Sequence, residues 1–292
     1  MENIDAKIEE ARQTFMGFYK KQRLYNNVAF ALVIVLIIAA YVVLQAWLGQ
    51  NFLALGSVGV ILILLYVYSR ISRTKMEKLT KGYISEYYGL MKEKVLPEDR
   101  YPHSVMDFDR KLELSTFTDA GILKDIVRIN TRAVVSFDFR GQEATVCDMA
   151  AYRSADPKQT PSYLGKFISV PLKLDLPGRI LVYIKPKVQG KGPDVLDDMK
   201  KVEENDRYVI YATDASTYKA LPSNFVRLLD TLTVDDLLVD ATFSIRADQT
   251  QVALSYTDAL MVIPLQNAFD PSPSEQYGKN LQTTLSILDS LK

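Results

Sequence analysis

Two long apolar runs near the N-terminus dominate the pattern of hydrophobic and polar positions. Residues 28–48 contain no charged side chain, and residues 52–69 contain none either. As helices these runs would be roughly 31 Å and 27 Å long, close to the ~30 Å hydrocarbon layer of a bilayer. A helix of this length in a soluble protein normally keeps a polar face. The pattern therefore predicts a transmembrane hairpin over residues 28–69.

Helical spacing continues on both sides of this hairpin. Residues 1–27 are predicted to form an N-terminal cytoplasmic helix with a narrow apolar stripe that includes Ile8 and Phe15. Residues 70–97 are predicted to form a juxtamembrane helix that Pro97 closes. The two arms have nearly equal lengths beyond the apolar runs. Whether they form a helical stalk or lie on the membrane stays open at this stage.

Charge is distributed unevenly around the apolar runs. No acidic residue lies between Glu10 and Glu77, and every cation in that interval flanks the outer ends of the hairpin. By the positive-inside rule this predicts a multi-pass protein of the plasma membrane with both termini in the cytoplasm. Aromatic side chains are expected at the two interfaces, with Trp47 near the outer one. The predicted membrane-interface residues are Lys20, Lys21, Arg23, Tyr25, Trp47, Tyr66, Tyr68, Arg70, Arg73 and Lys75.

Residues 98–292 change to short apolar segments separated by turns. Residues 132–139 and 143–149 flank Arg140-Gly-Gln142, which indicates a hairpin with a glycine turn. The segments 241–246 and 250–256 indicate a second hairpin.

Three further features follow from the same pattern. Residues 167–174 and 179–185 are expected to pair across Asp175–Gly178, with Pro171 at an edge or a bulge. Residues 275–291 are predicted to form a C-terminal amphipathic helix, and a further strand is expected over 260–264.

The predicted fold class is α+β, a transmembrane hairpin with a helical stalk followed by a cytoplasmic domain of mainly antiparallel sheet.

Composition narrows the chemistry that this chain can carry. The 35 basic and 35 acidic residues cancel, so nucleic acid is not an expected partner. One cysteine, Cys147, precludes an intramolecular disulfide and is expected to be a small buried hydrophobe. The single histidine, His103, is expected in an exposed loop. No catalytic residue and no cofactor is predicted.

Three further motifs could suggest ligand binding, but each also has a simpler structural explanation. Gly190-Lys-Gly192 lacks the spacing of a phosphate-binding loop and is expected to be a turn. The acidic groups 194–198 and 235–240 could bind Ca²⁺ or Mg²⁺ through carboxylate oxygens. Neither has the spacing of an EF-hand, and runs of charge are usually solvated.

The order of several short motifs resembles a known family. These motifs are Asp138-Phe-Arg-Gly141, Gly165–Val170, Asp206–Asp214, Leu221–Phe225 and the hairpin Phe243–Leu254, after the anchor and before a terminal helix. In this order the chain resembles the bacterial two-pass membrane proteins of the domain of unknown function 3137. The resemblance implies the same anchor and an envelope setting. It carries over no catalytic residue.

These patterns favour a membrane-anchored cytoplasmic interaction module, a scaffold or an accessory subunit of a bacterial envelope complex. A lipid or small-ligand sensor at the inner membrane surface is the alternative, and a metal-dependent enzyme is a weaker one. The expected partners are the lipid bilayer and a membrane or cytoplasmic protein. A homo-oligomer through the helical hairpin stays open.

Overall fold

The computed structural model describes residues 3–48, 51–156, 158–186, 194–235, 237–257 and 270–291. The chain divides into two units, and the boundary falls between Leu90 and Met91. The first is a pair of long helices, and the second is an antiparallel sheet with short helices. The predicted mixture of helix and antiparallel sheet, with a long apolar helix near the N-terminus, is confirmed. The expected strand over 260–264 and the Gly190-Lys-Gly192 turn lie outside the described residues.

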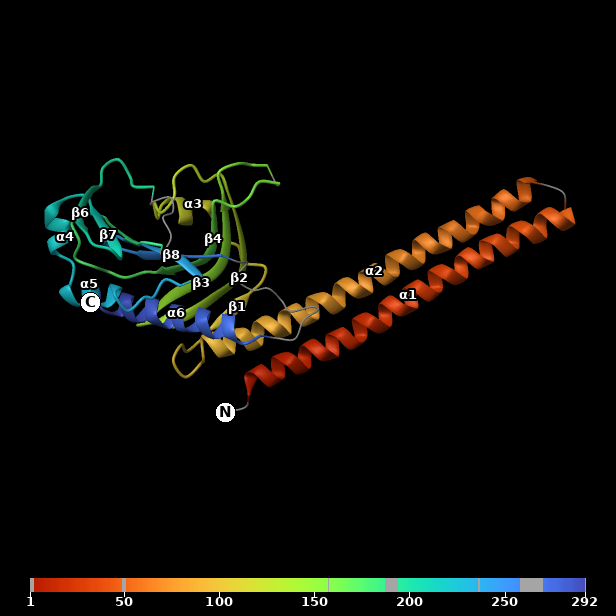
Figure 1. Ribbon diagram of the computed structural model, residues 1–292, viewed down its shortest axis with the longest axis horizontal. Coiled ribbons are helices and arrows are strands. Elements are labelled where there is room, and N and C mark those ends of the chain that lie inside the picture. The colour runs from red at the N-terminus through yellow and green to blue at the C-terminus, as the bar shows by residue number, and fades with distance from the viewer. Residues whose placement is uncertain are drawn as a thin grey trace. The chain divides into compact units, whose positions relative to one another are not determined.

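The helix pair consists of α1 (Ile4–Leu48) and α2 (Asn51–Val95), each 45 residues long. In each helix, the apolar run and the polar arm form one uninterrupted element, because the sequence places no proline between them. α2 ends two residues before Pro97. Figure 1 shows the two helices side by side and antiparallel.

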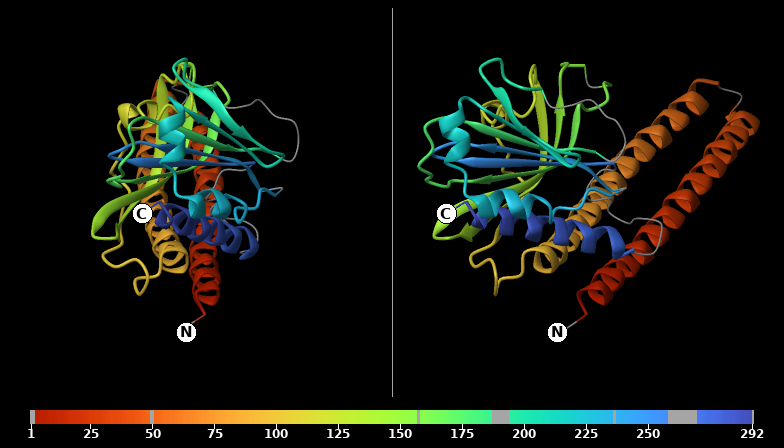
Figure 2. Two further views of the ribbon diagram at one scale, coloured as in Figure 1. Left: turned by 90° about the vertical axis from the view of Figure 1, so that its left-hand side faces the viewer. Right: turned by 60° about the vertical axis from the view of Figure 1, so that its left-hand side comes forward.

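The second unit is built on one sheet of nine antiparallel strands in the order β1-β2-β3-β4-β9-β8-β5-β7-β6. Strands β2–β4 run across the direction of β5 and β8, so the sheet is strongly twisted (Figure 2). The strands are β1 (Val105–Asp107), β2 (Arg128–Phe139), β3 (Gln142–Tyr152), β4 (Tyr163–Val170), β5 (Ile180–Ile184), β6 (Lys200–Glu204), β7 (Tyr208–Ala212), β8 (Leu238–Ile245) and β9 (Thr250–Tyr256). The helices of this unit are α3 (Leu114–Thr118), α4 (Ala215–Lys219), α5 (Ser223–Leu229) and α6 (Ser272–Asp289).

Two predicted hairpins are confirmed. β2 and β3 are joined by Arg140 and Gly141, which both have positive φ (58° and 73°), as a two-residue hairpin turn requires. β8 and β9 pair from Leu238↔Tyr256 to Ile245↔Thr250.

The predicted hairpin across Asp175–Gly178 is wrong. β4 pairs with β3 and β9, and β5 pairs with β7 and β8, so these two strands are not neighbours. β4 ends at Val170 because Pro171 has no N–H to continue the ladder. Pro171 therefore lies at neither an edge nor a bulge but after the end of an internal strand.

Each face of the sheet buries a different apolar cluster. On one face Cys147 pairs in register with Phe167, and both pack with Phe117 of α3. On the other face α5 and α6 pack through ring contacts, Phe225 against Phe243 and Tyr277 against Tyr256. The edge strand β6 is short and charged, which discourages pairing with another sheet.

Candidate membrane interface

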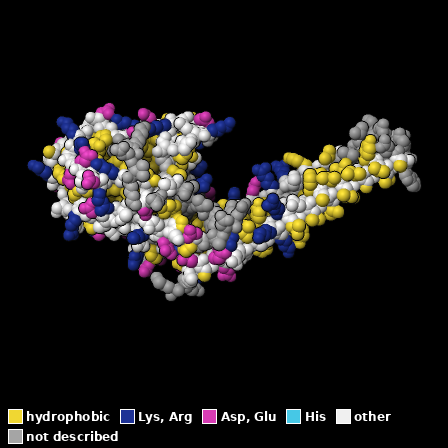
Figure 3. All heavy atoms as spheres, viewed as in Figure 1, with side chains coloured by type: hydrophobic (Ala, Val, Ile, Leu, Met, Phe, Trp, Pro, Cys, Tyr) yellow, Lys and Arg dark blue, Asp and Glu magenta, His cyan; other side chains and the backbone are white. Residues whose placement is uncertain are grey.

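The middle of the helix pair exposes most of its large apolar side chains. Between Val28 and Val43 on α1 and between Val60 and Ile71 on α2, the exposed large hydrophobic side chains are 39% to 64% accessible, whereas Val33, Ile37 and Leu65 are half-buried. On the face seen in Figure 3 these side chains form an apolar band along the helices, called the apolar sleeve below. Soluble proteins rarely expose apolar patches of this extent. Within the described residues, one helix, Ile4–Val43 of α1, has the length and apolar composition to span a membrane.

A cluster of four polar side chains joins the two helices at one end of this sleeve. The carboxamide oxygen Oδ1 of Asn26 accepts hydrogen bonds from Ser72 Oγ (2.7 Å), Gln22 Nε2 (3.1 Å) and Tyr68 Oη (3.2 Å). Gln22 Nε2 also lies 3.4 Å from Ser72 Oγ. These bonds link α1 to α2 where the apolar runs end, with Tyr68 as the one member inside a run.

A second contact fixes the same register further along the pair. The rings of Phe15 and Tyr83 stack with centroids 4.6 Å apart and planes 11° apart. Phe15 is eleven residues before Asn26, and Tyr83 is eleven residues after Ser72. Eleven residues are close to three helical turns, so both contacts use the same face of each helix. Burial raises the pKa of the Tyr83 phenol to about 12, and the nearby Arg12 guanidinium opposes this shift.

This register places the predicted cations of both helices near the same end of the apolar runs. Because Asn26 lies opposite Ser72 in an antiparallel pair, Arg23 is level with Lys75, and Lys20 is offset from Arg70 by roughly 12 Å along the pair. The α1 group is Lys20, Lys21 and Arg23, and the α2 group is Arg70, Arg73 and Lys75. The sequence predicted both groups but not that hydrogen bonds would align them.

The predicted interface aromatics have different surroundings. Tyr25 is 54% exposed, and the Lys21 ammonium lies 6.0 Å from its ring centroid. Tyr66 is 64% exposed, whereas Tyr68 turns its hydroxyl toward Asn26. The side chain of Trp47 lies outside the described residues.

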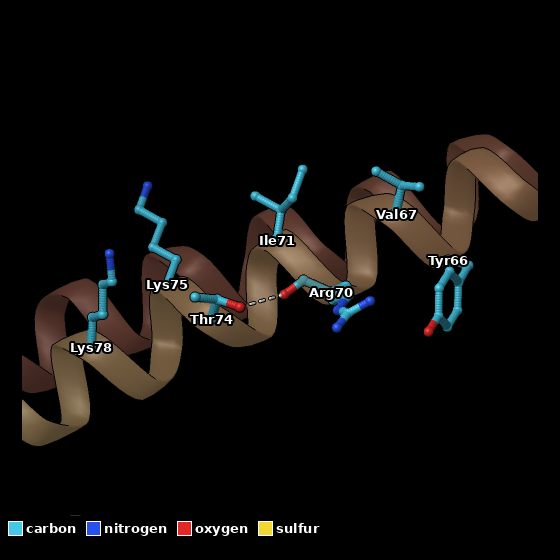
Figure 4. Close-up of a pocket in the computed structure, with 7 residues that line it drawn as sticks. All are labelled: Tyr66, Val67, Arg70, Ile71, Thr74, Lys75 and Lys78. Atoms are coloured by element: carbon cyan, nitrogen blue, oxygen red, sulfur yellow. Dashed lines mark hydrogen bonds between the residues drawn. The ribbon is translucent and has the colours of Figure 1, made fainter.

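A shallow groove runs along α2 through part of this cation group (Figure 4). Its volume is about 640 Å³. Val67, Ile71, Lys75 and Lys78 extend from the same side of the helix in Figure 4. Thr74 donates its hydroxyl to the carbonyl of Arg70 (3.0 Å), one turn earlier. The lining residues are Tyr66, Val67, Arg70, Ile71, Thr74, Lys75 and Lys78.

Several residues of this interface were not predicted from the sequence. Gln22, Asn26 and Ser72 form the polar cluster with Tyr68, and Val67, Ile71, Thr74 and Lys78 line the groove. The signal for the cluster was present, since Asn26 and Ser72 each lie within three residues of the end of an apolar run. Lys78 was missed because it follows Glu77, where the cation-only interval ends.

Two carboxylates of the first acidic group, Asp194 and Asp197, take part in other interactions, and Asp198 is exposed. Asp194 forms an ion pair with Arg153 and accepts the backbone N–H of Lys124. Asp197 pairs with the Lys124 ammonium at 2.6 Å, and this hydrogen bond lowers the pKa of its carboxyl. No group of three metal-ligating side chains occurs among the residues described here.

The second acidic group is likewise engaged. Asp235 accepts the backbone N–H groups of Leu237 and Leu238 and the side chain of Gln276. Asp240 accepts a hydrogen bond from Ser255, and burial raises the pKa of its carboxyl. Asp236 lies outside the described residues.

The single cysteine and the single histidine lie where the sequence predicts them, in the core and in an exposed loop. Cys147 is 1% exposed, and burial raises the pKa of its thiol, which suits a core residue. His103 is exposed in a loop with φ of 59°, and its N–H donates to Glu98.

Comparison with known protein families, with curated proteins and with solved structures found no match for this chain.

Proposed function

We propose that α1 and α2 both cross a membrane as an antiparallel pair and anchor the protein there. The observation that carries this proposal is the register set by Asn26 and Ser72. It aligns the two apolar runs, so a single bilayer could solvate the exposed side chains of both. The polar cluster and the cations then lie together at one interface, where water and headgroups satisfy them.

The cations also support an orientation for the anchor. All of those between Glu10 and Glu77 flank the same end of the pair. By the positive-inside rule this end faces the cytoplasm, so the protein is a two-pass protein of the bacterial inner membrane with both termini cytoplasmic. The sheet unit follows α2 and would lie on the cytoplasmic side.

The proposed role is a membrane-anchored interaction module, a scaffold or accessory subunit of an envelope complex. Two features support it. The candidate metal ligands Asp194 and Asp197 are held by Arg153 and Lys124, which is a structural use of these carboxylates. The order of motifs resembles the domain of unknown function 3137, and we propose kinship with that family on this resemblance.

Cysteine accessibility tests the anchor. In a Cys147→Ala background, single cysteines replace Asn3, Gln50 or Ser290, and intact cells are treated with a membrane-impermeant maleimide. Labelling is expected at position 50 alone, with positions 3 and 290 reacting only after permeabilisation. Labelling at position 290 in intact cells would reverse the orientation, and equal labelling at all three would reject the hairpin.

Affinity purification of the full chain in a mild detergent tests the interaction role. We expect a stoichiometric membrane or cytoplasmic protein to co-purify. Repeated recovery of the chain alone, with and without chemical crosslinking before lysis, would argue against a scaffold or accessory subunit.

A lipid-sensing role is favoured by one specific observation, the groove of Figure 4.

A further inference from the structure

The middle of the groove lies on the side of α2 that faces away from α1, while Lys75 and Lys78 also border a second pocket that α1 helps to line. The α2 residues that contact α1 include Tyr68, Ser72 and Tyr83, which share one face of the helix. At 100° per residue, Val67 and Thr74 lie on the opposite face. The groove is open to its surroundings, since Tyr66 and Ile71 are each 64% exposed.

Polarity changes in one direction along this face. Tyr66 and Val67 belong to the apolar run, Arg70 follows it directly, and Lys75 and Lys78 lie further out. The rise from Arg70 to Lys78 is roughly 12 Å, more than the ~5–8 Å headgroup layer of one leaflet. Long lysine side chains can bend back toward that layer. The three cations can therefore serve one headgroup region while the apolar end meets acyl chains.

The cations of this face also differ from their neighbour Arg73. The Arg73 guanidinium forms an ion pair with Glu77 at 3.0 Å. Among the described residues, Arg70, Lys75 and Lys78 have no acidic side chain within ion-pair distance. The groove is therefore lined by three positive charges that no described carboxylate neutralises.

We propose that this face of α2, residues 66–78, is a binding site for an anionic phospholipid such as phosphatidylglycerol. Arg70 binds the phosphate through its planar guanidinium, which suits bidentate contact with phosphate oxygens. Lys75 and Lys78 add charge, and Tyr66, Val67 and Ile71 pack against the acyl chains. The inference rests on the proposed function, because the groove meets a headgroup only if α2 spans the membrane.

Native mass spectrometry of the full chain tests this site. The purified protein in mild detergent is titrated with phosphatidylglycerol or phosphatidylcholine of identical acyl chains. The wild type is expected to bind phosphatidylglycerol about tenfold more tightly than phosphatidylcholine. The variant R70Q/K75Q/K78Q is expected to lose this preference by about fivefold or more, because it removes the cations of the groove.

The matched control is K20Q/K21Q/R23Q, which removes the same amount of charge from α1 at the level of Lys75 and Lys78. It is expected to keep the preference within about twofold. Arg70→Lys preserves the charge but not the bidentate guanidinium, so it should lose less of the preference than the triple groove variant does. An equal loss in both triple variants, or no loss in the groove variant, would overturn the site.

Two further measurements separate the alternatives. If the groove variant changes the oligomeric state and not the lipid preference, this face is a protein contact and the proposal is wrong. Displacement of phosphatidylglycerol by glycerol phosphate alone would overturn the proposed packing of Tyr66, Val67 and Ile71 against the acyl chains. Carbonate extraction of cell membranes reports the anchor separately, since release of the wild type would reject the proposed function, whereas retention without lipid preference rejects only this inference.

Discussion

Ser72 on α2 donates a 2.7 Å hydrogen bond to the same oxygen of Asn26 that also accepts from Gln22 and Tyr68. One carboxamide oxygen therefore receives donors from both helices. It stands at the point where both apolar runs end, so it sets how the two runs align. A slip of one turn would move one group of cations by roughly 5 Å relative to the other.

This contact predicts an intramolecular crosslink. In a Cys147→Ala background, the pair Asn26→Cys and Ser72→Cys should form a disulfide on mild oxidation, because the side chains already meet. Electrophoresis without reductant should show a monomer of altered mobility. Leu24→Cys with Ser72→Cys is the control, since Leu24 is 62% exposed and points away from α2. A crosslinked dimer in the first pair would show that the contact joins two copies.

The sequence indicated both helices because an uncharged run of 18–21 residues is a strong local signal. It did not indicate their register. The register depends on which polar side chains meet across the pair. From the sequence, Asn26 could equally be an exposed residue that only water contacts. The side-by-side contact of Phe15 with Tyr83 likewise joins residues 68 positions apart and leaves no local trace.

The buried ion pair of the sheet unit provides a stability prediction. Lys166 Nζ lies 2.6 Å from Asp148 Oδ1 and 5.6 Å from the ring centroid of Tyr277. Asp148 Oδ2 is buried and has no hydrogen-bond partner among the described residues. Lys166→Met would leave this carboxylate without its cation and should cost about 3–5 kcal/mol of unfolding free energy.

Cys147 supplies the measurement, because it is the single thiol and is buried in the sheet unit. Its reaction with a thiol reagent over a urea series reports the opening of that unit in the full chain. The double variant D148N/K166M removes both charges and should recover more than half of the loss. Equal stability of the single and double variants would show that the cost comes from packing.

The pairing of β4 shows what the sequence could not supply. The two confirmed hairpins have turns of two to four residues, so the pairing information is local. β4 instead pairs with β9, more than 80 residues later, and the turn-like Asp175–Gly178 connects strands that bond elsewhere. Apolar alternation identifies a strand but not its distant partner.

Acid should weaken the sheet unit partly through Asp214. Its carboxylate accepts hydrogen bonds from the Ser216 hydroxyl and the Thr217 N–H at the start of α4, and these lower its pKa to about 2. A carboxyl with a lowered pKa stabilises the fold above its ordinary pKa of 3.8, and this contribution is lost as pH falls toward 2. Asp214→Asn keeps an acceptor but no charge.

The Asp214→Asn variant should therefore be less stable than the wild type at pH 5, and the difference should shrink at pH 3. Urea midpoints from Cys147 labelling with 4,4′-dithiodipyridine, which reacts in acid, check this. A constant difference at both pH values would mean that the carboxylate charge is not involved.

Two glycines should respond very differently to alanine. Gly141 has φ of +73° at the β2–β3 turn, and an added Cβ would meet no atom within 4 Å. Gly141→Ala should therefore cost only the left-handed strain of about 1–2 kcal/mol.

At Gly165 an added Cβ would lie 2.6 Å from Tyr163 Oη, and closer still to the carbonyl oxygen of Leu254. That oxygen belongs to β9, the partner of β4, so the two strands would have to separate. Gly165→Ala should therefore cost more than about 3 kcal/mol and expose Cys147 at lower urea than Gly141→Ala does. Equal midpoints for the two variants would mean that β4 and β9 can move apart at little cost.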